Sequence, residues 1–541
     1  MSDHTTTGTD WWRNAVVYQI YPRSFADGNG DGTGDIAGMR ARLPYLAELG
    51  IDAIWVNPWY RSPLNDGGYD VADYRNIDER FGSIDDAQAF VDEAGGHGIR
   101  VIVDLVPNHT SSEHAWFQAA LAAGPGSPER ERYHFLPGRG DDGELPPSDW
   151  TSVFGGRAWE RCPDGEWYLH LFDSTQPDLN WEHPEVRAEF ESILRFWLDR
   201  GVAGFRVDVA HALAKHPDYE DVGDRDQRDG PRWTEGHPFW DRDEIHPIIR
   251  SWRRVLDEYD DRMMVAEAWV RADRRPLYLR PDEYHQAFDF EFLSADWDAE
   301  QFGGIIEQST TAARDVGSNP TWVLSNHDVV RHATRYGLPG GTDSAAWLLD
   351  GPHHLLDAEQ GHRRARAAAL LTLALPGSAY VYQGEELGLP EAWDLSTDVL
   401  DDPVWTDSGH RRKGRDGCRV PIPWEATGPS LGFGDAEGWL PQPVGYAALA
   451  AAVQHDDDGS TLNLYRSALR IRREHFTADF DITMIDLGAD VLAFERGNGA
   501  RCVVNMGAVP IAIPEGVVLL ASAPLDDGEL PADAAVWLAA H

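Results

Sequence analysis

Short apolar runs alternate with helical segments along most of the chain. Eight of these runs are predicted to be β-strands, at residues 16–21, 51–58, 99–104, 204–210, 263–267, 287–292, 321–325 and 378–383. Helices are predicted between them, including 39–49, 83–95, 186–200 and 361–375. A chain that repeats strand and helix in this way predicts an α/β fold, a closed parallel (β/α)8 TIM barrel.

The predicted strand at 204–210 alternates apolar residues with Arg206 and Asp208. Burying two charged groups is costly unless they are paired, so a structural ion pair is one interpretation of this strand. Three other strand ends also turn polar, in the segments 104–109, 266–269 and 325–328. Because polar groups at successive strand C-termini are typical of barrel active sites, the second interpretation is a catalytic site.

Two stretches interrupt the barrel pattern. Residues 110–176 are rich in Pro, Gly, charged and aromatic residues, and the stretch is too long for a simple loop, so a small inserted domain is predicted after the third strand. The segment 474–541 contains alternating apolar runs separated by turn signals, which predicts a C-terminal antiparallel β domain resembling a sandwich. The barrel is then expected to comprise residues 1–109 and 177–473.

Composition narrows the possible partners and compartment. The formal net charge is −44, which makes nucleic acid and anionic membranes poor partners. No apolar run approaches the length of a membrane span, and the polar N-terminus has no signal-peptide core. The three cysteines, Cys162, Cys418 and Cys502, are widely spaced and predict neither a disulfide framework nor a zinc site. We therefore expect a cytoplasmic protein.

A glycine-rich segment after the first strand carries oxygen-bearing residues at every second position. They are Asp27, Asn29, Asp31, Thr33 and Asp35. This spacing resembles the first nine positions of a calcium loop, although the acidic twelfth position of an EF-hand is absent. A turn that binds no ion is the alternative. Since clustered carboxylates repel one another unless they are neutralised, we expect a structural Ca2+ here.

Six ordered motifs resemble those of the α-amylase-type glycoside hydrolases, family 13. They are Asp104 with Asn108-His109, Gln176-Pro-Asp178-Leu-Asn180, Gly204-Phe-Arg206-Val-Asp208, Glu267-Ala-Trp269, Asn326-His327-Asp328 and Gly384-Glu-Glu386-Leu-Gly. The resemblance covers essentially the whole chain. It implies that the substrates are sugars and that the chemistry needs no metal.

The resemblance also implies roles for three carboxylates. Asp208 is expected to be the nucleophile, Glu267 the general acid/base, and Asp328 a third carboxylate that binds sugar hydroxyls. Acetal cleavage needs a carboxylate on each side of the anomeric carbon. Arg206, close to Asp208 on the same strand face, is expected to keep that carboxylate ionised. Apolar neighbours are expected to raise the pKa of Glu267.

Further residues resemble the substrate-binding set of α-glucosidases and oligo-1,6-glucosidases. His109 and His327 resemble the histidines that bind sugar hydroxyls, whereas a lone histidine is more often a packed core residue. Asp66 and Tyr69 resemble the residues that grip a terminal glucose. Arg415 and Arg419 resemble arginines of the loop after the eighth strand, although Gly417 and Cys418 depart from the expected pattern. A carboxylate at the blind end of a pocket implies exo-action.

The resemblance therefore predicts an exo-acting retaining α-glucosidase, which removes terminal glucose from short oligosaccharides through a covalent intermediate. Val209, directly after Asp208, resembles the valine of enzymes that prefer α-1,6 bonds, or it simply packs the barrel. An oligo-1,6-glucosidase is thus one alternative. A second is a glucosyl-transferring or isomerising enzyme acting on sucrose or maltose. A third, a non-catalytic barrel used as an interaction subunit, is disfavoured by the complete carboxylate set.

Overall fold

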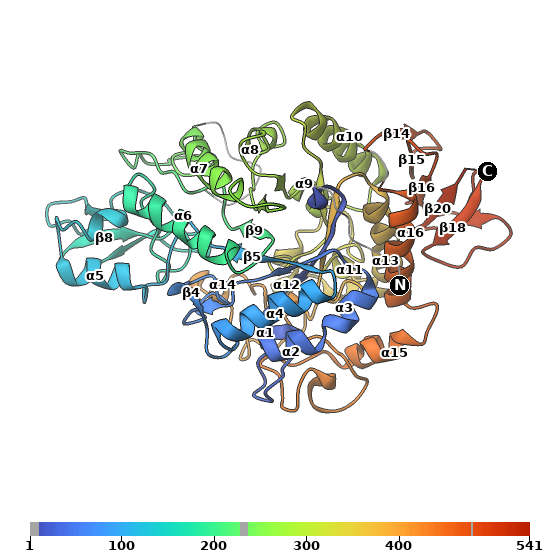
Figure 1. Ribbon diagram of the computed structural model, residues 1–541, viewed down its shortest axis with the longest axis horizontal. Helices are drawn as coiled ribbons and strands as arrows, with labels where there is room; N and C mark the ends of the chain where they lie inside the picture. Colours follow the sequence, from blue (N-terminus) through green and yellow to red (C-terminus); the bar gives the residue numbers. More distant parts are fainter. Residues whose placement is uncertain (1–9, 228–235, 478–479, 541) are drawn as a thin grey trace.

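The computed structural model describes residues 10–227, 236–477 and 480–540, and it confirms the predicted barrel. Neighbouring strands of its eight-stranded sheet pair in parallel, in the order β11-β10-β9-β5-β2-β1-β13-β12 (Figure 1). The strands are β1 Val16–Ile20, β2 Ala53–Val56, β5 Arg100–Leu105, β9 Gly204–Val207, β10 Met263–Ala266, β11 Gln286–Ala287, β12 Thr321–Val323 and β13 Ser378–Tyr382. A backbone hydrogen bond from Asp289 N to Thr321 O (3.0 Å) joins the two ends of the sheet.

Side-chain alternation along β9 explains why charged groups face the barrel interior. Phe205 and Val207 belong to the large apolar core that the strands share with the surrounding helices. Residues of the opposite parity point inward, so Arg206 lies over Trp55, which belongs to a separate interior cluster. The interior is filled with side chains, as in other barrels of this kind. Arg206 therefore lies inside the barrel near the C-terminal end of β9, and Asp208 directly follows that strand.

Long helices cover the outside of the barrel, and three of them lie close to the helices predicted at 83–95, 186–200 and 361–375. They include α4 Ile84–Gly96, α6 Pro184–Leu198, α7 His246–Leu256, α10 Ala299–Asp315 and α13 Ala358–Ala374. The N-terminus of α4 is fixed by a capping box in which the Ser83 hydroxyl accepts from Asp86 N while the Asp86 carboxylate accepts from Ser83 N. Such a cap satisfies backbone donors that would otherwise lack partners.

Two of the predicted elements are wrong. The segment 39–49 is not one helix but belongs to two, α2 Ile36–Ala41 and α3 Leu43–Leu49, because Pro44 has no N–H to continue the hydrogen-bond ladder across the junction. The sixth strand is only two residues long, and α9 Phe290–Ser294 replaces its predicted second half. The Asp289 side chain accepts from Phe292 N and so caps this helix.

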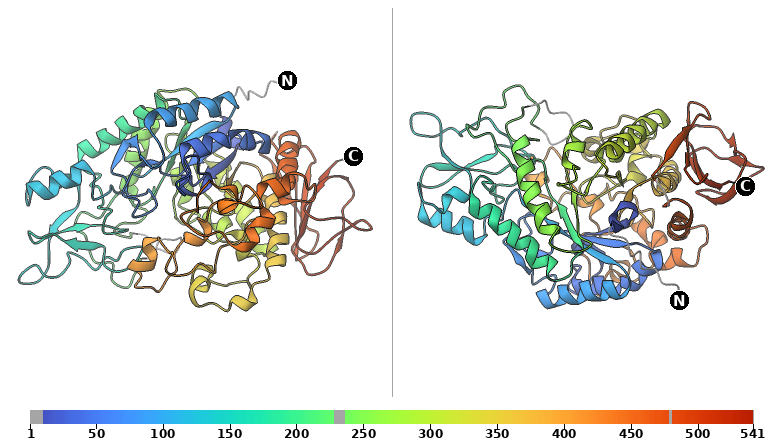
Figure 2. Two further views of the ribbon diagram at one scale, coloured as in Figure 1. Left: turned by 90° about the horizontal axis from the view of Figure 1, so that it is seen from below. Right: turned by 45° about the horizontal axis from the view of Figure 1, so that its top comes forward.

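Two smaller β structures lie at opposite ends of the molecule (Figures 1 and 2). Between β5 and β9, α5 Ala115–Ala123 accompanies a sheet of β6 Phe135–Pro137, β8 Glu166–Leu169 and β7 Trp159–Arg161. After α16 Thr461–His475, an antiparallel sheet contains β14 Ile482–Ile485, β15 Val491–Arg496, β16 Arg501–Asn505, β20 Ala534–Ala539 and β18 Val517–Ala521. The predicted C-terminal antiparallel domain is confirmed. The domain boundaries remain predictions.

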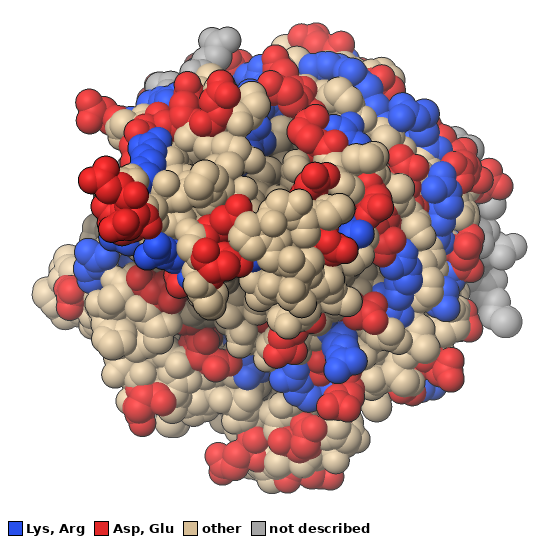
Figure 3. Space-filling model, turned by 90° about the vertical axis from the view of Figure 1, so that its left-hand side faces the viewer, with Lys and Arg blue, Asp and Glu red and all other residues tan. Residues whose placement is uncertain are grey.

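The surface agrees with the excess of acidic residues. On the face shown in Figure 3, Asp and Glu side chains are scattered widely, with smaller groups of Lys and Arg between them. Among the described residues, none of the helices is both long and apolar enough to cross a membrane.

Asp533 connects the C-terminal sheet to the barrel helices. Its buried carboxylate accepts from Arg364 Nε (2.7 Å), Trp297 Nε1 (2.9 Å) and Gln360 Nε2 (3.1 Å). The substitution Asp533→Ala leaves these donors without their shared acceptor. Because losing a hydrogen bond to a charged group costs about 1.5–3 kcal/mol, we expect a lower melting temperature in calorimetry. The exposed Asp458 provides the control: Asp458→Ala should leave the melting temperature unchanged, and equal effects would contradict the assignment.

Candidate active site

Most of the predicted site residues meet in one cavity of about 320 Å³ at the C-terminal ends of the barrel strands. Asp208 directly follows β9, Glu267 directly follows β10, and Asp328 lies in the turn after β12. Eight of the predicted residues line the cavity: Asp66, Tyr69, His109, Asp208, Glu267, His327, Asp328 and Arg415. Arg206 and Arg419 are 1% and 2% exposed and lie behind the carboxylates.

Arg206 contacts three carboxyl groups at once. Its Nη1 lies 3.0 Å from Asp104 Oδ1 and 2.6 Å from Asp208 Oδ1, and its Nη2 lies 2.9 Å from Glu267 Oε2. A planar guanidinium can donate in several directions simultaneously, which a lysine ammonium does less rigidly. Arg206 therefore fixes the positions of Asp208 and Glu267 relative to each other.

The charges around Arg206 do not balance, because one guanidinium serves three carboxyl groups. Burial raises the pKa of Asp208 above its usual range, against the lowering effect of Arg206. Burial also raises the pKa of Asp104 to about 6, with Arg206 again opposing the shift. Arg206 lowers the pKa of Asp208 as expected, and whether it keeps the carboxylate ionised stays a prediction. Desolvation and the neighbouring acids outweigh a single cation.

Glu267 lies in a more polar environment than the sequence suggested. Its Oε2 accepts from Val209 N (2.9 Å) as well as from Arg206, and its Oε1 accepts from Trp269 Nε1 (3.2 Å). Val209 has φ +44°, an uncommon backbone region for a β-branched residue, and this turn brings its N–H to the carboxylate. The expectation of apolar neighbours missed these donors, and the bend of the chain directly after the strand brings Val209 N to Glu267.

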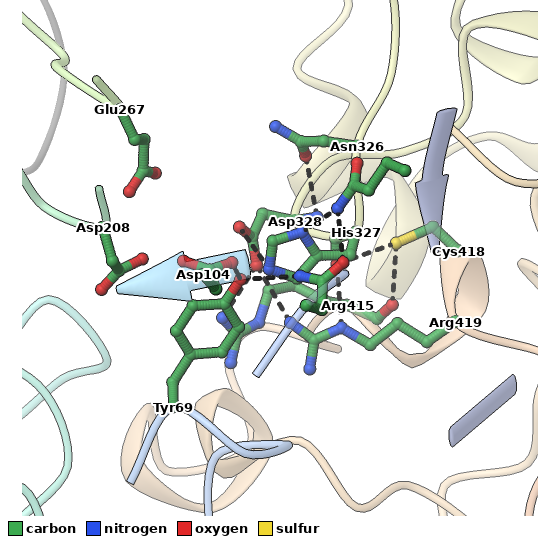
Figure 4. Close-up of polar contacts among 12 residues, drawn as sticks. Tyr69, Asp104, Asp208, Glu267, Asn326, His327, Asp328, Arg415, Cys418 and Arg419 are labelled. Atoms are coloured by element: carbon green, nitrogen blue, oxygen red, sulfur yellow. Dashed lines mark hydrogen bonds and ion pairs between the residues drawn. The ribbon is translucent and has the colours of Figure 1, made fainter. Parts of the chain in front are cut away.

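Asp328 lies across the cavity from Asp208 and Glu267 (Figure 4). Its carboxylate contacts Arg415 Nη1 (3.1 Å), Arg419 Nη2 (2.9 Å) and His327 Nε2 (3.1 Å). Although burial alone would raise it, electrostatic interactions with His327, Arg415 and Arg419 hold the pKa of Asp328 well below its usual range. Asp328 is therefore ionised at neutral pH, which suits a group that accepts hydrogen bonds from sugar hydroxyls.

Asp66 lines the cavity and is 3% exposed. Its Oδ1 accepts from Arg415 Nη2 (2.7 Å) and its Oδ2 accepts from Gln176 Nε2 (3.0 Å). Arg415 thus bridges Asp66 to Asp328, and its Nε also contacts Asp402 Oδ2 (2.7 Å). Although burial alone would raise it, Arg415 holds the pKa of Asp402 at about 2. This network forms a rigid, charged end wall.

Tyr69 and His109 form the neighbouring wall. The Tyr69 ring stacks on His327 with centroids 5.2 Å apart, and its hydroxyl donates to Asp104 Oδ2 (2.9 Å). Burial lowers the pKa of His109 to about 4, so its imidazole is neutral at pH 7. A neutral imidazole can both donate and accept. These groups suit a ligand that carries several hydroxyls.

Three functional neighbours were not assigned a role from the sequence. Asp104 and Gln176 fall inside recognised motifs, but nothing in the sequence shows that they contact Tyr69 and Asp66. Asp402 lies in a long loop, where an Asp-Pro pair marks the start of α14 Pro403–Asp407. That signal predicts a helix cap. The ion pair of Asp402 with Arg415 depends on loop geometry.

The predicted calcium loop has local side-chain contacts of its own. Asp27 accepts from three backbone N–H groups of the loop, Asn29 accepts from Asp31 N, and Asp35 caps α2 through Gly38 N. In the described part of the chain, no group of three or more His, Cys, Asp or Glu side chains is placed to hold a metal. The calcium site stays a prediction.

A parallel barrel with two carboxylates at adjacent strand ends, facing a hydroxyl-binding wall, is the arrangement of a glycoside hydrolase. Residues 19–479 match the family model of the α-amylase catalytic domain. The chain is 36% identical to a probable alpha-glucosidase of Rhizobium meliloti over 92% of this chain and 89% of that protein. It is 34% identical to the oligo-1,6-glucosidase of Parageobacillus thermoglucosidasius over 86% and 84%.

Solved structures give the same picture. An alpha-glucosyl transfer enzyme, XgtA, is similar with a TM-score of 0.83, at 35% identity over 98% of this chain and 99% of that one. The trehalulose synthase MutB from Pseudomonas mesoacidophila is similar with a TM-score of 0.85, at 30% identity and the same coverage. The chain belongs to the α-amylase family of glycoside hydrolases, family 13, as its motifs predicted.

The position of Asp402 leads to a kinetic prediction. Asp402→Asn keeps an oxygen for the helix cap to Val404 N but removes the charge that holds Arg415. A weakened Arg415 no longer positions Asp66 and Asp328, so kcat/KM should fall by about tenfold, equivalent to ~1.4 kcal/mol. The adjacent Asp401 pairs with Arg23 and is half exposed. Asp401→Asn is the control, and equal kinetics for both variants would contradict this role.

Proposed function

We propose that this protein is an exo-acting, retaining α-glucosidase that releases terminal glucose from short α-linked oligosaccharides. The observation that carries the proposal is the charged network of Asp66, Arg415 and Asp328 in the lining of the cavity. A chain end fits against such a wall, whereas the interior of a polysaccharide does not. The names of the relatives, an alpha-glucosidase and an oligo-1,6-glucosidase, support this activity.

In the proposed mechanism, Asp208 attacks the anomeric carbon and Glu267 protonates the departing oxygen. The carbon–oxygen bond of the glycoside breaks as a glucosyl ester forms on Asp208. Glu267, now ionised, takes a proton from water, whose oxygen then displaces Asp208. Arg206 holds both carboxyl groups in position for the two steps. Asp328 is proposed to bind sugar hydroxyls more strongly as positive charge develops on the ring.

Two alternatives are favoured by particular relatives. The similarity to an oligo-1,6-glucosidase favours α-1,6 linkages. The similarity to a trehalulose synthase, whose variant has been solved in complex with the substrate sucrose, favours isomerisation of sucrose. A panel of maltose, isomaltose and sucrose, with the products identified, distinguishes the three activities. Glucose and fructose from sucrose indicate hydrolysis, whereas a new disaccharide indicates isomerisation.

The cysteines and the charge bear on location and partners. Cys162, Cys418 and Cys502 are all buried and unpaired. We infer a cytoplasmic location, because free thiols suit a reducing compartment. The net charge of −44 supports neutral sugars as partners rather than nucleic acid or an anionic membrane.

Asp66→Ala tests the closed pocket. Charge-assisted hydrogen bonds are worth roughly 1.5–3 kcal/mol each, so kcat/KM on maltose-type substrates should fall by about tenfold to a hundredfold. Asp208→Asn should instead abolish turnover while substrate still binds, because the nucleophile acts in bond breaking. Product analysis with maltotriose should show glucose released one unit at a time. Rapid loss of starch viscosity would show that the pocket is open.

The retaining mechanism predicts the anomer that is released first. Two displacements at the same carbon return the starting configuration, so α-glucose should be the initial product. Proton NMR during the first minutes of turnover distinguishes the anomers before mutarotation mixes them. Initial release of β-glucose would indicate a single displacement by water and would rule out a glucosyl ester on Asp208.

We further propose that the loop after β1 binds one structural Ca2+. The ligands would be the side chains of Asp27, Asn29, Asp31 and Asp35 with the carbonyl of Thr33. Hard oxygen ligands at alternate positions suit Ca2+, and the neutral amide and carbonyl complement the three carboxylates. None of these residues lines the cavity that holds Asp208 and Glu267, so the ion would stabilise the fold and take no part in the reaction.

A chelator tests the calcium proposal. Binding only to the folded state stabilises by about 2.7 kcal/mol at a hundredfold excess over Kd, so EDTA should lower the melting temperature by several degrees. Added Ca2+ should restore it. Asp31→Ala, at an exposed ligand position, should abolish the difference between the two conditions. A melting temperature that EDTA leaves unchanged in the unsubstituted protein would refute the site.

A further inference from the structure

A second cavity of about 560 Å³ lies beside the catalytic cavity. Its wall is built from the end of α9, the start of α10, α11 His332–Arg335 with the loop that follows it, and the start of α12 Ser344–Asp350. Val329 and Ser344 line both cavities, and Val329 directly follows Asp328. Since pockets of this size commonly hold small molecules, the second cavity is a candidate binding site.

The two arginines in this wall are engaged with other parts of the protein. Arg335 donates to three backbone carbonyls, those of Leu293, Leu324 and Val330. Arg364 donates through Nε to Asp533 Oδ1 (2.7 Å) and through Nη1 to Tyr336 O (3.0 Å). Because these guanidinium groups already have acceptors, they have few N–H groups left for an anionic ligand. The wall therefore does not favour a phosphate or a carboxylate.

Three exposed carboxylates of the wall each accept one backbone N–H. They are Asp296, Asp298 and Asp343, which accept from Gly341 N (3.0 Å), Gln301 N (2.8 Å) and Ala346 N (3.0 Å). Each of these hydrogen bonds uses one oxygen of the carboxylate. The other oxygen remains an acceptor for a donor in the cavity. The wall thus offers several strong acceptors.

Neutral hydrogen-bonding groups complete the wall. Ser294, Gln301 and Ser344 line the cavity, and Gln301 Oε1 accepts from Asp296 N (2.9 Å), which leaves its amide nitrogen as a donor. Tyr336 also lines the cavity and is 2% exposed, and its hydroxyl has no hydrogen-bond partner among the described residues. Burial raises the pKa of Tyr336 to about 12, so this hydroxyl keeps its proton and can donate. Donors and acceptors therefore alternate around the cavity.

The wall suits neither a metal ion nor an organic cation. Within the described ranges, no group of three or more His, Cys, Asp or Glu side chains is placed to hold a metal. An organic cation binds best over an aromatic ring. Both rings of this wall already have a guanidinium over them, Arg364 at 6.0 Å from the centre of Trp297 and Arg335 at 5.6 Å from that of Tyr336. A further cation there would be repelled.

We propose that the second cavity binds a neutral sugar, as a non-catalytic site beside the active site. Its carboxylates accept from sugar hydroxyls, and its hydroxyl and amide groups donate to sugar oxygens. Hydrogen bonds to carboxylates are the stronger ones. The residues assigned a role in the reaction, including Asp208, Glu267 and Asp328, do not line this cavity. The site is therefore additional to the proposed activity, and only the choice of glucose as a probe rests on that activity.

Two sources supply a sugar of this kind. One is a free molecule, such as the glucose that the proposed reaction releases. The other is the far end of a longer oligosaccharide whose terminal glucose occupies the catalytic cavity. Both sources present the same hydroxyl groups to the wall, and the shared residues Val329 and Ser344 place the two cavities next to each other. The experiments below distinguish the two sources.

Crystals of the Asp208→Asn variant, soaked with glucose or with maltotetraose, provide the direct test. The substitution prevents turnover of the oligosaccharide and lies outside the second cavity. Sugar should occupy both cavities. Sugar in the catalytic cavity alone overturns the inference and leaves the proposed α-glucosidase activity intact. Absence of both sugars from the catalytic cavity would contradict that activity, whatever the second cavity contains.

A substitution that fills the cavity tests binding in solution. Gly340 lines the cavity, and a Cβ added there meets no atom within 4 Å, so Gly340→Trp should fill the space without strain. Glucose should raise Tm through both sites, and Gly340→Trp should remove roughly half of that rise if the sites bind equally. Gly304→Trp, at an exposed and equally open position of α10, is the matched control. Equal glucose-induced rises in the two variants overturn the inference.

The ratio of kcat/KM for maltotetraose to kcat/KM for maltose identifies the source of the sugar. If the cavity binds the far end of the substrate, Gly340→Trp should lower this ratio by about fivefold or more while kcat/KM for maltose is unchanged. If the cavity binds free glucose, the ratio should match that of Gly304→Trp, and only the glucose-induced rise in Tm should fall. A Gly340→Trp variant that changes neither quantity refutes the site.

Discussion

The buried guanidinium of Arg206 is the interaction on which the site depends. It contacts Asp104, Asp208 and Glu267 within 3.0 Å, and its side chain is 1% exposed. Removing this buried cation would leave three acids facing one another. That change costs more free energy of folding than the loss of an exposed ion pair. Since the three acids follow or belong to the adjacent strands β5, β9 and β10, the same residue ties the reactive groups to the geometry of the barrel.

The barrel imposes a second constraint through the backbone after β9. Alternation along the strand points Arg206 and Asp208 inward, while Phe205 and Val207 pack outward against the helices. The chain then turns at Val209, whose positive φ brings its N–H to Glu267. A strained residue beside reactive groups is common at functional sites. Here the turn fixes the Glu267 carboxylate relative to the end of β9.

Strand periodicity predicted the barrel, and the resemblance of the ordered motifs to family 13 predicted eight of the residues that line its cavity, because both are local signals. They did not predict the short sixth strand, where an Asp289 cap starts a helix early. They also gave no role to Asp402, whose partner Arg415 is brought near by loop folding. The environments of Asp208 and Glu267 were predicted incompletely, because they too depend on which segments meet in the folded chain. Burial and contacts between segments are properties of the folded chain.

The central claim is that Asp208 forms a covalent bond to glucose. The most direct measurement uses 5-fluoro-α-glucosyl fluoride, whose electron-withdrawing fluorine slows both displacements while the good leaving group keeps the first one fast. Intact-protein mass spectrometry should show one added fluoroglucosyl group, and fragmentation of the digest should place it on Asp208. An adduct on another carboxylate, or steady turnover of glycosides by Asp208→Asn, would contradict the account.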